Sequence, residues 1–297
     1  MKRLINSKQF ILTSILLPAL LLYAFTIFIP ICYSAMQSVT DASSMNAETI
    51  FIGLENYRKI IFTDKTFWNS ILHAAILGLC YVFIQHPIAI MSAILICKLK
   101  PRAETFFRII FFLPAVISLV VTTMMWKNIY NQIFGLLNQF LKFIGLGHLQ
   151  TDWLGNPKTA FPALLIMILW QGFGMGFLLY YAGVKRIPGD IYEAAQVDGA
   201  SGFRLAWHIT VPLLSPVMRV AMTMGVVNAL KTMEAVYIST NGGPGDKTQF
   251  VANYMYRIAF QNYQWGYANA LAITFIIICL SVTMIMNHAL KRDVGEF

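Results

Sequence analysis

Long apolar runs without a charged residue dominate the chain and set its fold class. Four of these runs cover residues 9–40, 66–97, 159–184 and 258–290. Each run is longer than the roughly 20 residues that a helix needs to cross a bilayer. Two shorter apolar segments complete the pattern, one between Arg108 and Lys127 and one around Lys231. The sequence therefore predicts an all-α membrane protein with six transmembrane helices.

The apolar pattern also gives approximate bounds and a domain organisation. The six predicted spans cover residues 10–36, 67–97, 106–130, 160–184, 216–240 and 265–290. The pattern shows no repeat, and its longer connecting segments are too short to fold as independent domains. Residues 1–297 are therefore predicted to form a single transmembrane domain, with both termini on one side of the membrane.

Composition and charge exclude several other classes of protein. Of the 297 residues, 58% are hydrophobic and only 12% are charged, which excludes an ordinary soluble or disordered chain. The net charge of +9 first suggests a nucleic-acid partner, but the basic residues are scattered between apolar runs. The sequence therefore predicts no nucleic-acid binding. The four cysteines lie within apolar runs without metal-ligand spacing, so neither a disulfide scaffold nor a metal site is expected.

The placement of Lys and Arg predicts the orientation of the spans. If the termini are cytoplasmic, 13 of these residues lie in cytoplasmic segments and 8 in the longer outer segments. Basic residues are enriched on the cytoplasmic side of membrane proteins. Trp68, Trp153 and Trp265 then fall near the outer interfaces, where tryptophan is common. The bias predicts that both termini are cytoplasmic.

The predicted cytoplasmic segment of residues 185–215 is unusually long for a plain connector. Asp190 and Glu193 have the spacing of a capping box, which predicts a short helix that opens at residue 191. Gly199 can end that helix in a left-handed conformation, and Ser201 can cap a second one. The segment is therefore predicted to form a bent pair of surface helices.

The first of these helices has a small apolar face with acidic neighbours. Ala194 and Ala195 supply the small side chains, and Glu193 and Asp198 supply the acids. One alternative is an interfacial helix on lipid headgroups, but such helices favour basic polar faces and bulky apolar residues. The acidic, alanine-rich composition favours a docking site for a cytoplasmic protein.

Here the sequence resembles the integral membrane permeases of bacterial and archaeal ABC importers, in the maltose-type and glycerol-phosphate-type carbohydrate-uptake branch. The residues that match the EAA motif of this family are Glu193, Ala194, Ala195, Asp198, Gly199, Ala200, Ile209, Pro212 and Pro216. Further landmarks are "FIGLENYRKI", "FFRIIFFLPAVIS", "GLLNQFL" with "WLGNP", and "NGGPGDKTQ" followed by "GYANALAI". The similarity extends over most of the chain.

The resemblance implies a type I importer permease that moves a saccharide or sugar-like solute across a bacterial or archaeal cell membrane. In the family, the EAA helices sit in a cleft of a cytoplasmic ATPase, so coupling is implied for Glu193, Ala194, Ala195, Asp198, Gly199 and Ala200. The implied partners are a paralogous second permease, an ATPase dimer and an extracytoplasmic solute-binding protein. ATP and Mg belong to the ATPase subunits, so this chain is expected to bind no cofactor and to be no enzyme.

Polar residues within the spans suggest a substrate pathway. Asn228, Lys231 and Glu234 are spaced by three, which places them on one face if the fifth span is a continuous helix. Charges at membrane depth either pair with each other or face a cavity. Lys231 and Glu234 could therefore form an ion pair, line the pathway, or do both.

The fourth span offers an aromatic surface that could stack on sugar rings, with Trp170, Gln171 and Tyr181 as candidates. Aromatic residues in membrane helices more often simply pack. Gly172 and Gly176 form a small-xxx-small pair that predicts close helix contact.

The sequence disfavours two other interpretations. The segment of residues 242–248, "GGPGDKT", lacks the spacing of a phosphate-binding loop and is predicted to be a tight turn. An ion-coupled secondary transporter, using Lys231, Glu234 and the histidines at 73 and 86, is the alternative function. The EAA motif argues against it, because an ion-coupled carrier needs no ATPase dock.

Overall fold

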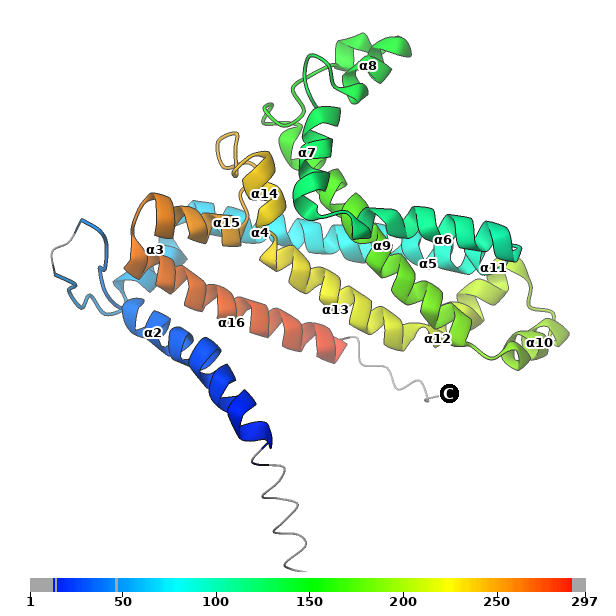
Figure 1. Cartoon of the computed structure of the whole chain (residues 1–297), viewed down its shortest axis with the longest axis horizontal. Helices are drawn as coiled ribbons and strands as arrows, with labels where there is room; N and C mark the ends of the chain where they lie inside the picture. The colour runs from blue at the N-terminus through cyan, green and yellow to red at the C-terminus, as the bar shows by residue number, and fades with distance from the viewer. Residues whose placement is uncertain (1–12, 14, 46–47, 290–297) are drawn as a thin grey trace, which may run out of the picture. The chain divides into compact units, whose positions relative to one another are not determined.

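The computed structural model describes residues 13, 15–45 and 48–289, and helices account for the regular structure of these residues, apart from one isolated antiparallel bridge between Thr40 and Phe51. In chain order the elements, with η for π-helical and 3-10 turns, are η1 (Ala24–Phe28), α2 (Ile29–Gln37), α3 (Glu55–Phe62), α4 (Lys65–Cys80), η2 (Tyr81–Gln85), α5 (His86–Ile96), α6 (Pro101–Val116), α7 (Leu119–Ile129), α8 (Leu136–Phe143), η3 (Gly147–Leu149), α9 (Ala160–Arg186), α10 (Gly189–Val197), α11 (Gly202–Leu205), η4 (Ala206–Thr210), α12 (Val211–Leu213), α13 (Ser215–Lys231), α14 (Glu234–Ser239), α15 (Val251–Tyr256), η5 (Arg257–Gln261) and α16 (Trp265–Ala289) (Figure 1). This confirms the all-α fold class.

Helix length and composition give four to six candidate membrane spans among the described residues. Four are continuous helices, which cover Ile15–Gln37, Lys65–Ile96, Ala160–Arg186 and Trp265–Ala289. The other two are bent pairs of helices, with a bend of 97° between α6 and α7 and of 71° between Gly202–Leu213 and α13. The predicted residues 10–12, 14 and 290 of the first and last spans lie outside the described residues.

Proline explains three π-helical turns in these helices. Pro30, Pro87 and Pro212 each lie two residues after a π turn, namely η1, η2 and η4. A proline has no amide hydrogen for the carbonyl four residues earlier, and its ring collides with that carbonyl. Widening the preceding turn relieves the collision, as at η2, where the His86 amide bonds to the Tyr81 carbonyl five residues back. The helices therefore continue through these prolines.

The structure differs from the sequence prediction at the third span, because residues 106–130 do not form one continuous helix. Ile117 and Ser118 have extended ψ angles of 135° and 146°, so α6 ends and α7 begins there. The Ser118 hydroxyl accepts a hydrogen bond from the Val121 amide at 3.4 Å. This is the N-cap interaction that serines make at helix starts, and it favours the break.

The chain divides into two compact units, and the first comprises Met1–Asp64 and Met255–Ile278. Its contacts hold the loop after α2 against α3 and α16. The buried Asn56 amide donates to the carbonyls of Ser38 and Thr40, both at 2.9 Å. The Gly266 amide donates to the Ala42 carbonyl at 2.8 Å, and a Cβ at Gly266 would lie only 2.2 Å from the Thr40 carbonyl oxygen. Glycine is therefore required at that close approach.

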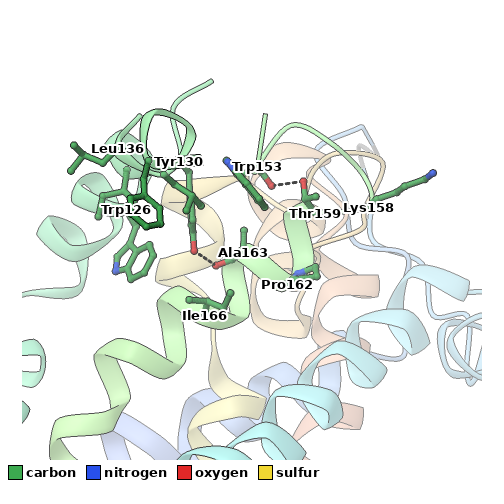
Figure 2. Close-up of a pocket in the computed structure, with 12 residues that line it drawn as sticks. Trp126, Tyr130, Leu136, Trp153, Lys158, Thr159, Pro162, Ala163 and Ile166 are labelled. Atoms are coloured by element: carbon green, nitrogen blue, oxygen red, sulfur yellow. Dashed lines mark hydrogen bonds between the residues drawn. The ribbon is translucent and has the colours of Figure 1, made fainter. Parts of the chain in front are cut away.

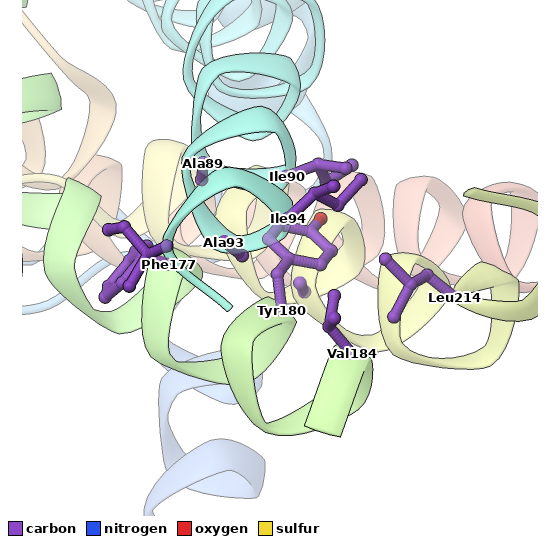
Figure 3. Close-up of a cluster of buried hydrophobic side chains, with 10 residues drawn as sticks. Ala89, Ile90, Ala93, Ile94, Phe177, Tyr180, Val184 and Leu214 are labelled. Atoms are coloured by element: carbon purple, nitrogen blue, oxygen red, sulfur yellow. The ribbon is translucent and has the colours of Figure 1, made fainter. Parts of the chain in front are cut away.

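The second unit comprises Lys65–Tyr254 and Cys279–Phe297, and its core lies around α5 and α9. Figure 3 shows this core, in which Ala89, Ala93 and Ile94 of α5 face Phe177 and Tyr180 of α9. The small alanines of α5 let the large rings of α9 approach closely. Burial of these rings stabilises the part of the bundle from which the segment after α9 departs.

Candidate functional site

The segment between α9 and α13 contains the predicted coupling residues, and its first helix is α10. Glu193, Ala194 and Asp198 are exposed, whereas Ala195 is buried, with 8% of its surface accessible. Ala195 therefore supports the helix from its inner face and does not present a surface to a partner. The outer face of α10 combines the two acids with Ala194, so only one of the two predicted alanines lies on it.

Gly199 ends α10 in the predicted left-handed conformation, with φ of 82°. The Gly199 amide donates to the Gln196 carbonyl at 3.0 Å, and the Ala200 amide donates to the Ala195 carbonyl at 2.9 Å. These two bonds form a Schellman motif, which satisfies carbonyls that the helix end leaves free. The helix therefore ends immediately after Asp198.

Two details of the cap predictions are corrected by the structure. The helix begins at Gly189, with Pro188 at the N-cap, so Asp190 is a first-turn residue and forms no capping box with Glu193. Proline suits this position because it has no amide hydrogen that would need a partner. The carboxylate of Asp190 in the first turn stabilises the helix through its interaction with the helix dipole. Ser201 precedes α11 as predicted, but its side chain makes no cap hydrogen bond.

The inner side of α10 closes over a cavity of about 330 Å³ at the ends of α5 and α9. Tyr192 and Gln196 line it from α10, and Thr210 lines it from the second half of the segment. The Thr210 hydroxyl donates to the Tyr192 hydroxyl at 3.4 Å. The two halves of the segment therefore contact each other and the bundle through the same cavity.

An ion pair close to this cavity joins α6 to α9. The Lys185 ammonium lies 2.6 Å from the Glu104 carboxylate, and the Tyr181 hydroxyl donates to the same carboxylate at 2.6 Å. The predicted pathway residue Tyr181 is therefore engaged in a contact between helices. Glu104 was not among the predicted site residues, and its signal in the sequence is an isolated acid within the basic stretch "KLKPRAE".

Trp170 and Gln171 lie near the middle of α9 and also make helix contacts. The Gln171 amide donates to the Ile117 carbonyl at 3.0 Å, which satisfies a carbonyl freed by the break between α6 and α7. The Trp170 and Trp126 rings meet edge to face, with centroids 5.8 Å apart. Since Tyr181 lies 11 residues beyond Trp170 on one helix, the two are about 16 Å apart along its axis and form no common stacking surface.

The fifth span is broken where its polar residues lie, which corrects the prediction of one helical face. Lys231 ends α13 and Glu234 begins α14, while Thr232 and Met233 between them are not helical. The Thr232 hydroxyl donates to the Asn228 carbonyl at 3.0 Å and replaces the backbone bond that would continue the helix. Lys231, Glu234 and Asn228 are exposed, and no ion pair joins Lys231 to Glu234 in the described part of the chain.

Glycines of α9 and α13 lie against the buried His86 and its neighbour Tyr81 in the second span. The His86 Nδ1 atom lies 3.0 Å from the Tyr180 hydroxyl, and His86 is 2% exposed. A Cβ at Gly172 would lie 3.0 Å from the Tyr81 hydroxyl, and one at Gly176 would lie 3.7 Å from His86. The predicted close helix contact is confirmed at Gly172, whereas the contact at Gly176 is of ordinary length.

The loops at the end of the bundle away from α10 enclose an apolar cavity of about 510 Å³ (Figure 2). Trp126, Tyr130 and Trp153 gather at this cavity between α7, α8 and α9, and the Tyr130 hydroxyl donates to the Ala163 carbonyl at 3.1 Å. The buried Asn138 of α8 accepts a hydrogen bond from the Trp153 indole at 2.8 Å. The lining offers few polar groups to sugar hydroxyls, so this cavity is not a candidate binding site for the solute.

Another cavity, of about 590 Å³ near the glycine-rich turn, has a partly polar lining, and no sequence pattern marks its residues. Its lining includes Lys127, Asn131, Gln132, Asp152, Ser239 and Thr240. The turn itself is confirmed: Gly242 has φ of 88°, and the Thr248 hydroxyl donates to the Gly243 carbonyl at 2.6 Å. These side chains offer the donors and acceptors that a polar solute requires.

Comparison with known proteins gives consistent results along the whole chain. Residues 68–294 match the family described as the binding-protein-dependent transport system inner membrane component. The probable ABC transporter permease protein YurN of Bacillus subtilis (strain 168) is 37% identical, with 99% of this chain and 100% of YurN covered. The multiple sugar-binding transport system permease protein MsmF of Streptococcus mutans is 30% identical, with 94% of each chain covered.

Solved structures agree with the fold. A bacterial ABC transporter that imports the acidic polysaccharide alginate contains a chain that superposes with a TM-score of 0.84, at 22% identity, over 99% of this chain and 100% of that one. The predicted type I importer permease fold, and with it a multi-pass membrane protein, is therefore confirmed, as is the resemblance to carbohydrate-uptake permeases. The family match and the relatives that are covered almost end to end show that this chain belongs to the ABC transporter permeases of the binding-protein-dependent transport system inner membrane component family.

Proposed function

We propose that this permease moves a saccharide or sugar-like solute into the cell, driven by ATP hydrolysis in separate ATPase subunits. Its relatives carry the names of such systems: MsmF belongs to a multiple sugar-binding system, and the 30% identical MalF of Thermococcus litoralis belongs to a trehalose/maltose transport system. The polar cavity near Lys127 supports a route for a hydroxyl-rich solute. Asn228, Lys231 and Glu234 remain candidates for its continuation, because they are exposed.

The acidic outer face of α10 is the observation that carries the coupling role. Glu193 and Asp198 are exposed beside the small Ala194, so no described part of the chain covers them, and Gly199 ends the helix directly after them. An ATPase surface with basic groups could approach this face closely and pair with both acids. Movement of the ATPase would then be transmitted through α10 to α9 and α13, on either side of the segment.

The proposal includes three partners and an orientation. They are a paralogous second permease, a cytoplasmic ATPase dimer that uses ATP and Mg, and a solute-binding protein outside the cell. The related alginate transporter has been solved in complex with its alginate-pentasaccharide-bound periplasmic protein, which supports the third partner. In this proposal both termini are cytoplasmic, in a bacterial or archaeal cell membrane, and the chain itself holds no cofactor and catalyses no reaction.

Affinity purification from native membranes tests this proposal. Tagged chain in mild detergent should recover an ATPase and a second permease, as identified by mass spectrometry. Glu193→Lys should lose the ATPase and keep the second permease, because it reverses a charge at the dock. Glu48→Lys is the matched control, since Glu48 is also an exposed acid but lies outside the segment, and this variant should keep both partners.

The opposite outcome would favour the ion-coupled secondary transporter. Recovery of the chain alone, under conditions that preserve other membrane complexes, would contradict the proposed importer. Loss of the ATPase from both lysine variants would also contradict the dock, because the effect would then follow net charge and not the position of Glu193.

A further inference from the structure

The second half of the segment between α9 and α13 exposes two large aromatic side chains. Phe203 is 76% exposed and Trp207 is 59% exposed. They are four residues apart on a helix, and their rings stack with centroids 6.1 Å apart and planes 12° from parallel. The stacked pair therefore forms one apolar surface that no other described part of the chain covers.

This surface differs in charge from the outer face of α10. The exposed neighbours of the aromatic pair are Arg204 and His208, whereas α10 exposes the acids Glu193 and Asp198. On the opposite side, Leu205 is buried and joins the segment to the bundle. The segment therefore has an acidic first half and an aromatic, basic second half.

The second half of the segment is sharply bent from the helix that follows it. The helix Gly202–Leu213 makes an angle of 71° with α13, and the two together form one of the bent candidate spans. Where α13 is the part that crosses the bilayer, with a tilt of about 20°, the helix before it lies within about 40° of the membrane plane. It follows Arg186, the last residue of the span α9, by a short chain, so it starts near the same surface.

We propose that Phe203 and Trp207 insert into the phospholipid headgroup region on the side of the membrane where this segment lies. Tryptophan and phenylalanine favour that level of the bilayer, and basic residues on the same helix pair with lipid phosphates. The acidic first half has the opposite sign and stays in water. Gly199 and Gly202, with φ of 82° and 55° and no atom close to either would-be Cβ, form the joint between the two halves.

The anchor gives the segment a fixed half and a movable half. Because α11 and η4 are held at the membrane surface, force on α10 is passed to the bundle at the glycine joint and through the contact between Thr210 and Tyr192. The inference requires only that the chain spans a membrane, which its family shows. It does not rest on the identity of the solute or the ATPase.

Cysteine accessibility tests the anchor. The native cysteines Cys32, Cys80, Cys97 and Cys279 are replaced by alanine in the full chain, and Trp207→Cys or the control Val197→Cys is added. Val197 is 88% exposed on α10, so the control is an accessible position of the same segment that lacks the proposed membrane contact. The chains are reconstituted without other proteins in vesicles of phosphatidylethanolamine and phosphatidylglycerol, with a charged maleimide on both sides.

We expect Trp207→Cys to react on the order of tenfold more slowly than Val197→Cys, since the headgroup region excludes a charged reagent. Phe203→Cys provides an independent second position and should behave like Trp207→Cys. Equal reaction rates at Val197→Cys and both aromatic positions would overturn the anchor. Fast reaction that slows only after the ATPase is added would overturn it as well, because a protein and not lipid would then cover the pair.

A depth measurement separates protection by lipid from protection by a local rearrangement. A fluorophore attached to Trp207→Cys should be quenched by headgroup spin-labelled lipid, and one attached to Val197→Cys should not. Slow labelling without such quenching would contradict the proposal.

Discussion

The ammonium of Lys185 lies 2.6 Å from the carboxylate of Glu104, and this contact joins the end of α9 to the start of α6 beside the segment that departs toward α10. The Tyr181 hydroxyl donates to the same carboxylate, so three residues share one contact. Because Glu104 is 14% exposed in its side chain and Lys185 is 45% exposed, the pair is only partly shielded from water. A moderate stabilising effect is expected.

A double-mutant cycle on this pair should show a favourable interaction. Glu104→Gln removes the charge but keeps an acceptor for Tyr181, and Lys185→Met removes the ammonium with little change of shape. We expect an interaction free energy of about 0.5–1 kcal/mol from the unfolding of the single and double variants in detergent. Additive effects of the two changes would contradict the ion pair.

The same experiment at Lys231 and Glu234 should give the opposite result. The two residues lie on different helices, α13 and α14, and no ion pair joins them in the described chain. Lys231→Met and Glu234→Gln should therefore be additive within about 0.3–0.5 kcal/mol in unfolding free energy. A large interaction would show that the break at Thr232 closes into a continuous helix under the conditions of the measurement.

Gly199 should be intolerant of a side chain for a purely conformational reason. Its φ is 82°, yet no atom lies within 4 Å of a would-be Cβ. Gly199→Ala should therefore cost roughly 1–2 kcal/mol in the local turn without any collision. We expect reduced uptake of radiolabelled sugar in cells, with normal amounts of the chain in the membrane.

Gly189 gives the matched control for that variant. It lies in the same segment, also has open space around it, and has no left-handed φ. Gly189→Ala should leave uptake unchanged. Equal loss of uptake in both variants would mean that any added methyl group disturbs the segment and that the turn at Gly199 is not special.

Asn138 should hold the loops around the apolar cavity together. Its side-chain amide donates to the Gln132 and Thr151 carbonyls at 3.1 and 2.9 Å, and its oxygen accepts from the Trp153 indole. Asn138→Leu leaves these buried groups unpaired, at about 1–3 kcal/mol for each group that stays without a partner. The melting temperature in detergent should fall and the fluorescence of Trp153 should shift.

The adjacent amide provides the comparison. Gln139 is exposed, and its side chain makes one hydrogen bond, to the Phe134 carbonyl at 3.0 Å. Gln139→Leu should change the melting temperature little. If the two variants were equally stable, the hydrogen bonds of Asn138 would contribute nothing measurable.

The sequence predicts the features that depend on short stretches of chain. The spans follow from apolar runs, and the left-handed turn at Gly199 follows from a glycine between two helical patterns. Features that depend on distant segments could not be predicted this way. Glu104 and Lys185 are 81 positions apart, and the Gln171 amide reaches a carbonyl 54 positions away. No local pattern marks such partners.

The breaks in the third and fifth spans were missed for a related reason. A serine or threonine inside an apolar run is compatible with a continuous helix and with a helix start, and hydropathy does not distinguish the two. Ser118 begins a new helix, and a distant glutamine satisfies the carbonyl that the break leaves free. The outcome depends on tertiary contacts that the one-dimensional pattern does not contain.

The glycines of α9 allow a prediction in which two similar substitutions have opposite signs. A Cβ at Gly174 would lie 2.9 Å from both the Ala115 side chain and the Phe111 backbone carbonyl oxygen, and a backbone carbonyl cannot move aside cheaply. A Cβ at Gly176 would lie 3.7 Å from the His86 ring, which is an ordinary contact. Alanine is otherwise favoured over glycine in a helix by about 1 kcal/mol.

We therefore expect Gly174→Ala to lower the unfolding free energy by about 1–3 kcal/mol, through overpacking against α6. Gly176→Ala should leave it unchanged or raise it by up to about 1 kcal/mol, because the helix propensity is gained without a collision. Melting temperatures of the two variants in the same detergent measure the difference directly. Since both positions are buried in the same helix, a similar loss at each would mean that α9 packs more tightly around Gly176 than the structure shows, and that the close approach of α6 to Gly174 is not the limiting contact.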